Sequence, residues 1–191
     1  YVARNRGLDE AKGKYITLHD ADDWSHPLKI ETQVRYMEAN QTALGTTTTQ
    51  ARAFSDLRFT RWTGAGRFII PNVSSFMFRR EIVKETFGYW DTVRFSGDSE
   101  LIRRIRYTYG KESVVDLPHG PFSFQRDSDT SIVADAILGM NGFFFGARRE
   151  YLHAQSHYRQ KPNAVLKYTA SITERPYPVP ASMLPNSEEA I

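Results

Sequence analysis

Short β-prone runs alternate with helical patterns through the first two thirds of this sequence, and that alternation restricts the fold most. The runs at 15–19, 73–78 and 112–118 are rich in residues that favour strands. Helical patterns at 79–88 and 98–110 each end at a glycine, a common way for helices to end. Alternating strands and helices predict an α/β domain, with helices layered on a sheet.

The start of the chain predicts a short helix followed by a strand. Asn5 can act as N-cap of that helix, and Gly13 suits the left-handed position that ends it. The run at 15–19 then indicates a buried strand. A second helix is expected after Pro27, with Ser25 or His26 as its N-cap.

The middle of the chain is less regular. Residues 43–54 contain four consecutive threonines, which predict an exposed or edge strand. Residues 55–72 have weak periodicity and two glycines, so we expect a long loop of the kind that often covers a site. In the helix that has Pro27 in its first turn, Ile30, Val34 and Met37 lie on one face, which we expect to pack against the core.

The last third of the chain is predicted to be helical from residue 132. The segment 149–160 indicates a surface helix. Residues 175–185 contain four prolines, so this tail should be extended and either lie along a surface or hang free.

The composition excludes several classes of protein. With 40% hydrophobic residues among 191, the chain can build a core and suits one domain, with room for an appendage. The net charge of +3 is small, and the basic cluster at 103–106 indicates a solvated helix face rather than a nucleic-acid stripe. The absence of cysteine excludes disulfides and thiolate metal sites, and fits a reducing compartment. No apolar run approaches the roughly 20 residues that span a bilayer.

Three carboxylates, Asp20, Asp22 and Asp23, lie within four positions directly after the strand at 15–19. Ligands in open α/β sheets sit beyond the carboxyl ends of strands, and paired carboxylates suit Mg²⁺ or Mn²⁺. The alternative is that these residues only serve the positive end of the next helix. An EF-hand loop is excluded by Trp24 and Ser25 at positions that need a ligand and a glycine.

Two further charged residues are candidates for a site. Asp98 lies at the front of the helix at 98–110 and on its inward face, where it could act as a general base or simply cap the helix. Arg4, at the start of the first predicted helix, could meet a phosphate or lie in solvent.

Histidine and tryptophan side chains offer weaker candidates. His19, His26 and His119 flank predicted loops, and His119 is the best placed for a metal. Trp90 could give a sugar ring a flat apolar platform or could pack in the core. With its neighbour Asp91 it is the candidate for binding an acceptor.

Taken in order, these segments resemble the family 2 glycosyltransferases with the GT-A fold. "ARNRGLDEAKGKYITLHDADDWSHPLKIETQV" is similar to that family's Arg-Asn-x-Gly loop, short helix, strand and Asp-x-Asp-Asp before a Pro-led helix. "SSFMFRREIVKETFGYWD" resembles the next block. "GDSELIRRI" resembles the block usually written Glu-Asp-x-Glu-Leu-x-x-Arg. The resemblance covers about residues 2–106, with the order and spacing of the family.

The resemblance implies a Rossmann-like mixed sheet flanked by helices and an inverting sugar transfer from a nucleotide-sugar donor to an acceptor hydroxyl. By motif position, Asp20 and Asp22 would hold a divalent manganese or magnesium ion. They would bind the donor together with Arg4 and Asp23. Asp98 matches the catalytic base that deprotonates the acceptor.

The resemblance also implies the partners. We expect a UDP-sugar donor of the hexosyl type and a glycan or lipid-linked acceptor, as in polysaccharide or glycoconjugate synthesis. Nucleic acid is not an expected partner. The expected location is the cytoplasm, with peripheral attachment to the inner face of a membrane as an option.

The chain departs from the family pattern in three places. The glutamate that usually precedes the base is Gly97 here. The segment 124–131 lacks the usual histidine, which leaves His119 as the candidate for a third metal ligand. By this resemblance we expect the half that binds the nucleotide base to be missing from this chain. Residues 1–131 are therefore expected to be a partial catalytic domain, and 132–191 a helical extension with a proline-rich tail. We therefore expect this chain alone to be inactive and prone to oligomerise.

Two other functions remain open at the level of sequence. The chain could be a non-catalytic module that keeps the glycosyltransferase fold and binds a partner as a scaffold. A metal-dependent nucleotidyltransferase also uses paired aspartates, although it usually has a glycine-rich phosphate loop.

Overall fold

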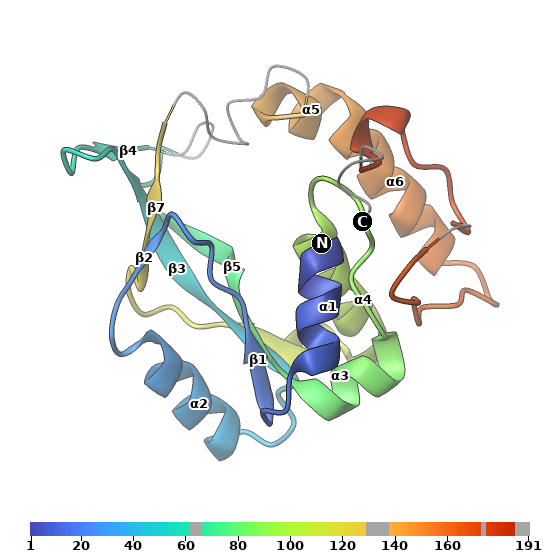
Figure 1. Cartoon of the computed structure of the whole chain (residues 1–191), viewed down its shortest axis with the longest axis horizontal. Helices are drawn as coiled ribbons and strands as arrows, with labels where there is room; N and C mark the ends of the chain where they lie inside the picture. Colours follow the sequence, from blue (N-terminus) through green and yellow to red (C-terminus); the bar gives the residue numbers. More distant parts are fainter. Residues whose placement is uncertain (62–65, 129–137, 173–174, 186–191) are drawn as a thin grey trace.

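The computed structural model describes residues 1–61, 66–128, 138–172 and 175–185, and it confirms a mixed α/β fold of the GT-A type, in which a curled sheet is flanked by helices (Figure 1). The helices are α1 (Val2–Glu10), α2 (Lys29–Ala39), α3 (Arg80–Phe87), α4 (Gly97–Tyr109), α5 (Met140–Phe145) and α6 (Ala147–Arg159). The strands are β1 (Tyr15–Thr17), β2 (Trp24–Ser25), β3 (Gly45–Ala53), β4 (Phe59–Thr60), β5 (Ile69–Arg79), β6 (Val114–Asp116) and β7 (Ser123–Arg126).

Strand β3 is the centre of the sheet, so its prediction as an exposed or edge strand is wrong. The strand order is β1-β5-β3-β7-β2, and β4 and β6 also pair with β3. β3 runs antiparallel to β5 and parallel to β6 and β7. Thr46, Thr47 and Thr48 are buried, and Gln33 and Asp116 form hydrogen bonds with the hydroxyl groups of Thr46 and Thr47.

The first two helices differ from the sequence prediction at their ends and faces. α1 begins at Val2, so Asn5 is a buried residue inside the helix and not its N-cap, and α1 ends before Gly13. On α2 the buried residues are Lys29, Gln33 and Met37, whereas Ile30 is exposed. Strand β1 is a half-buried edge strand instead of a buried one.

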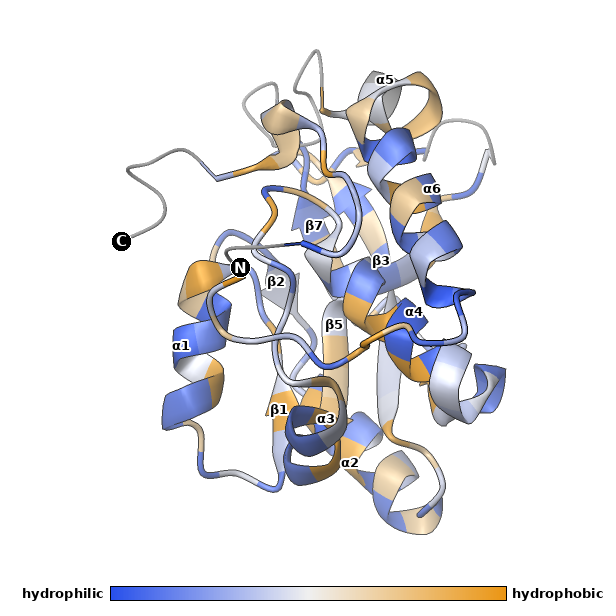
Figure 2. Ribbon diagram, turned by 90° about the vertical axis from the view of Figure 1, so that its right-hand side faces the viewer, coloured by the Kyte–Doolittle hydropathy of each residue, from blue (hydrophilic) through white to orange (hydrophobic). Residues whose placement is uncertain are grey.

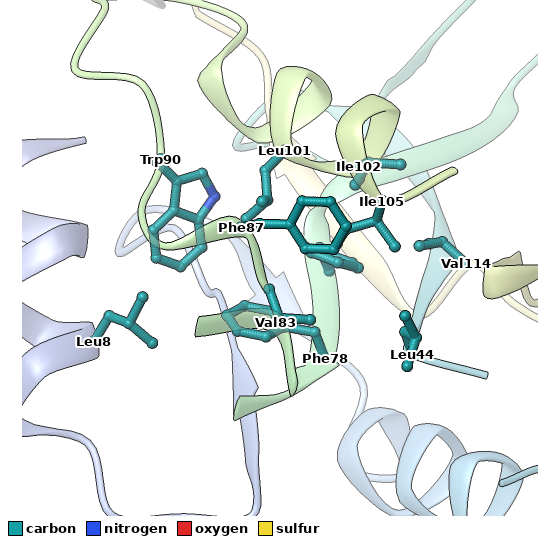
Figure 3. Close-up of a cluster of buried hydrophobic side chains, with 11 residues drawn as sticks. Leu8, Leu44, Phe78, Val83, Phe87, Trp90, Leu101, Ile102, Ile105 and Val114 are labelled. Carbon is teal, nitrogen blue, oxygen red and sulfur yellow. The ribbon is translucent and has the colours of Figure 1, made fainter. Parts of the chain in front are cut away.

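Helices α3 and α4 pack on the sheet and enclose the main hydrophobic core (Figure 3). The predicted glycine stops are confirmed at Gly88 and Gly110, which have φ values of 68° and 88° that favour glycine. The core joins α1, the sheet and the two helices through the side chains of Leu8, Leu44, Phe76, Phe78, Val83, Phe87, Trp90, Leu101, Ile102, Ile105 and Val114.

The C-terminal segment packs against the preceding domain through a second hydrophobic cluster. Tyr151 and Gln155 of α6 are fully buried, so the segment 149–160 is not a surface helix. Figure 2 shows the mixed polar and apolar colouring of α4 and α6, which contact each other. The proline-rich tail lies along the domain, where Met183 O accepts a hydrogen bond from Arg94 N at 2.8 Å. The boundary at residue 131 stays a prediction.

Two expectations fall partly on residues without a described structure. Within the predicted loop at 55–72, the short strand β4 forms and β5 begins at Ile69, while 62–65 lie outside the described residues. The start of the predicted helical region, 132–137, also lies outside them. No helix in the described part of the chain combines the length and apolar character needed to span a membrane.

Candidate active site

A cavity of about 550 Å³ brings together the charged residues that the sequence singled out. Its lining includes Arg4 of α1, Asp20, Asp22 and Asp23 of the turn after β1, and Asp98 at the start of α4. These residues come from three segments up to 94 positions apart in the chain. Their convergence is the main observation that supports a functional site here.

The acidic turn is held in place by two arginines. Asp23 N donates to Asp20 O at 3.2 Å and closes the turn. Arg4 Nη2 donates to Asp20 Oδ1 at 2.9 Å, and Arg126 Nη2 donates to Asp22 Oδ2 at 3.2 Å. The backbone N–H of Arg126 donates to Asp23 Oδ1 at 3.1 Å, which ties the turn to β7.

The three carboxylates of the turn repel one another. Burial raises the pKa of Asp23, the hydrogen bond from Arg126 N opposes the rise, and the charges of Asp20 and Asp22 add to it. A cation beside the turn would relieve this repulsion. Helix α2 begins at Lys29, whose ammonium donates a hydrogen bond to Ser25 Oγ at 3.0 Å.

Asp98 lies inside the first turn of α4 and not at its N-cap, a position that Ser96 occupies. Its Oδ1 accepts a hydrogen bond from Ser99 N at 2.7 Å, and its Oδ2 lies 3.8 Å from Arg4 Nη1. Arg4 thus pairs with both Asp20 and Asp98 and sets the spacing between the acidic turn and α4. Its Nη1 has no hydrogen-bond partner among the described residues.

The cavity is also lined by arginines that the sequence interpretation did not assign to a site. They come from four separate parts of the fold: Arg52, Arg94, Arg126 and Arg148. With Arg4 they balance the aspartates and suit an anionic ligand such as a phosphate. Of these four arginines, only Arg126 lies in a segment that was compared with the family pattern, 124–131.

Two carboxylates of the turn are suited to a divalent cation. Asp20 and Asp22 each use one oxygen to bind an arginine, which leaves the second oxygen of each available within the described residues. Hard carboxylate oxygens with room for phosphate oxygens match Mg²⁺ or Mn²⁺. The described residues contain no converged group of three or more His, Asp or Glu side chains. The described lining of the cavity includes none of the three candidate histidines, His19, His26 and His119.

Trp90 and Asp91 do not reach the cavity, so the structure argues against their assignment to acceptor binding. Trp90 is 1% exposed and packs against Phe78 in the core, which was the alternative left open for it. Asp91 is fully buried and accepts hydrogen bonds from Tyr151, Tyr177 and Arg175. Asp91 therefore anchors the C-terminal segment to the domain.

Gly97 precedes Asp98 at a place where a larger side chain would not fit. A Cβ atom at this position would lie 2.9 Å from the Tyr1 ring and 3.0 Å from Asp91 O. The backbone and the Tyr1 ring therefore fill the space beside Asp98 that a glutamate would need.

Two comparisons with known proteins show the family of this chain. Residues 1–152 of the 191 match the model of the family described as glycosyl transferase family 2. Over 40 residues the chain is 46% identical to an uncharacterized glycosyltransferase of Methanocaldococcus jannaschii. That stretch covers 21% of this chain and 14% of the length of that relative. Because the family model matches most of the sequence, the chain belongs to the family 2 glycosyltransferases.

Proposed function

We propose that this protein transfers a sugar from a nucleotide-sugar donor to an acceptor hydroxyl, with inversion at the anomeric carbon and with a divalent cation. The observation that carries the proposal is the convergence of Arg4, Asp20, Asp22 and Asp98 on one cavity. Paired carboxylates, a basic wall and a separate carboxylate are the three elements that such a displacement requires.

The donor end of the site is the acidic turn with its arginines. Asp20 and Asp22 would hold Mn²⁺ or Mg²⁺, which when bound offsets the negative charge that develops on the leaving diphosphate. Arg4 and Arg126 already lie against these two carboxylates and would orient phosphate oxygens by charged hydrogen bonds. Asp23 fixes the turn through Arg126 N.

Asp98 is the proposed general base. Its carboxylate faces the same cavity and is separated from the acidic turn by Arg4, so an acceptor hydroxyl beside it would approach the donor from the side opposite the diphosphate. Asp98 would take the proton of that hydroxyl as the oxygen attacks the anomeric carbon. Direct attack from that side inverts the configuration of the carbon.

The finer assignments belong to the same proposal. A UDP-sugar of the hexosyl type is the donor that we favour, with a glycan or lipid-linked acceptor in polysaccharide or glycoconjugate synthesis. A cytoplasmic location, peripheral membrane attachment, oligomerisation and the inactivity of this chain alone stay predictions.

Calorimetric titration of the full-length protein with UDP, in the presence and absence of Mn²⁺, tests the donor end of the site. We expect UDP binding to need Mn²⁺ and to weaken about 10–100-fold in Asp22→Asn, because one ligand oxygen is lost. Asp9→Asn is the matched control, since Asp9 also pairs with a cation, Lys84, but outside the cavity. Metal-independent binding, or equal affinities of the two variants, would contradict the proposal and favour a scaffold module.

A further inference from the structure

A groove of about 330 Å³ lies beside the cavity. It shares Asp22, Gln125 and Arg126 with the cavity, and neither Arg4 nor Asp98 lines it. These three residues therefore form a wall that is common to the two spaces.

Trp24 gives this groove an exposed aromatic face. Its indole is stacked on Phe124, with ring centroids 4.9 Å apart and an interplanar angle of 24°. Phe59 also contacts Phe124, in an edge-on arrangement with ring centroids 5.3 Å apart. Although these rings support Trp24, its side chain is still 48% exposed, an uncommon state for a tryptophan on a fixed support.

The tight turn between β3 and β4 also lines the groove. Leu57 N donates to Phe54 O at 2.9 Å, and Phe54 N donates to Arg58 O at 3.0 Å. Leu57 has a φ of 63° and is 67% exposed, a costly conformation for a bulky apolar residue. The turn thus presents a second apolar surface at the edge of the groove.

Polar groups of both kinds surround the aromatic face. Asp22 supplies carboxylate oxygens, Arg126 and Gln125 supply N–H donors, and Ser55 supplies a hydroxyl. A sugar ring needs this combination, since its C–H face is attracted to the negative face of an aromatic ring and its hydroxyls need donors and acceptors around the rim. The groove volume lies within the range of small-ligand sites.

We propose that the Trp24 groove binds a sugar unit of a saccharide chain, at a place separate from the unit that reacts. The inference goes beyond the proposed function, because neither Arg4 nor Asp98 lines the groove. It also moves the aromatic platform expected of Trp90 to Trp24.

Binding of the chain to an array of immobilised oligosaccharides, followed by titration with the free sugars that bind, tests this proposal. We expect Trp24→Ala to weaken saccharide binding about tenfold, a loss of roughly 1.4 kcal/mol, and Trp24→Phe to weaken it less because the flat face remains. Tyr107→Ala is the matched control, since Tyr107 is also about half exposed but lies on α4 outside the groove. Thermal unfolding of each variant checks that it is folded.

Parallel UDP titrations of the full-length protein with Mn²⁺ separate this proposal from the previous one. We expect UDP affinity to be unchanged in Trp24→Ala and to fall in Asp20→Asn, whose saccharide binding should stay intact. The groove assignment would be overturned if no sugar on the array bound. It would also be overturned if Trp24→Ala and the wild type bound saccharides equally well. A loss of UDP affinity in Trp24→Ala would also overturn it, because Trp24 would then stack on the nucleobase. Saccharide binding through Trp24 without metal-dependent UDP binding would instead refute only the donor site.

Discussion

Helix α4 carries two carboxylates, two residues apart, in opposite surroundings. Asp98 lies at the cavity wall, and its only charged contact within 4 Å among the described residues is Arg4, at 3.8 Å. Glu100 is fully buried and accepts a hydrogen bond from Arg104 Nε at 2.8 Å. Because a helix has about 3.6 residues per turn, positions two apart face nearly opposite sides. One short segment therefore places one carboxylate at the cavity and another in a buried network.

The two regions differ in how fully their charged groups are satisfied. Around Glu100, Arg104 also donates to the carbonyl oxygens of Phe87, Tyr89 and Leu166, so the pair joins α4 to two loops. In the cavity, Arg4 keeps an unbonded Nη1. Closed hydrogen-bond networks of this kind stabilise a fold, whereas polar groups without a hydrogen-bond partner at a cavity are available to bind a ligand.

The largest effect that separates the two carboxylates is expected for Asp98→Asn. In the full-length protein, the sugar-transfer rate should fall about 10²–10⁴-fold, since the proposed general base is lost. The fold and the affinity for UDP with Mn²⁺ should remain near those of the wild type, because Asp98 is not in the closed network. Asp116→Asn, a carboxylate paired with Arg106 outside the cavity, is the control. Full activity of Asp98→Asn would refute the assignment.

For Arg104→Met we expect a loss of stability instead of a specific loss of activity. This change leaves the buried Glu100 without its nearest cation, and we expect the free energy of unfolding to fall by about 3–5 kcal/mol. Urea unfolding measures the loss.

Arg35→Met is a control with matched geometry. Arg35 pairs with Glu31 at the same i,i+4 spacing, but both side chains are exposed. Its loss should be no more than about 0.5 kcal/mol. Similar losses for the two variants would show that burial does not distinguish the pairs.

The parts of the fold that could be predicted from sequence are those set by local chemistry. Gly88 and Gly110 end their helices because positive φ favours glycine, and β5 is specified by a run of β-prone residues. The acidic turn and Asp98 could be located because short motifs carry them. Their meeting in one cavity is a property of the fold, and it agrees with the order of the motifs.

The rest could not be predicted because it depends on partners far away in the sequence. A run of threonines is typical of an exposed strand, but Thr46 and Thr47 of β3 are buried and form hydrogen bonds with Gln33 and Asp116. The inner face of α6 contains Gln155, which bonds to Arg159, so its polarity hides its burial. Trp24 lies beside the acidic motif, and Arg52, Arg94 and Arg148 lie outside the quoted motifs, so only their positions in space bring them to the cavity and the groove.

Asn5 offers a smaller test of the stabilising side of the comparison. Its side chain is buried, donates to Trp90 O at 3.1 Å and accepts from Trp90 N at 3.0 Å. Asn5→Ala leaves both backbone groups unpaired in the core, and we expect a loss of about 1–3 kcal/mol in the free energy of unfolding. Asn163→Ala, at an exposed position, should have no measurable effect in the same urea titration. Equal unfolding free energies for Asn5→Ala and Asn163→Ala would mean that the hydrogen bonds of Asn5 do not stabilise the packing of α1.

The smallest effect concerns the dependence of stability on pH. Burial raises the pKa of Glu100 in the folded state, although the charges of Arg104 and Arg159 oppose the rise. Between its ordinary value of 4.5 and the raised value, the folded state therefore binds more protons than the unfolded state, and stability should fall as pH increases. For one group the slope cannot exceed about 1.4 kcal/mol per pH unit. Glu100→Gln removes the titrating group, so its unfolding free energy should decline less over this range than that of the wild type. All other titrating groups are shared, so parallel curves would show that the Glu100–Arg104 pair stays ionised throughout and that burial does not control its charge.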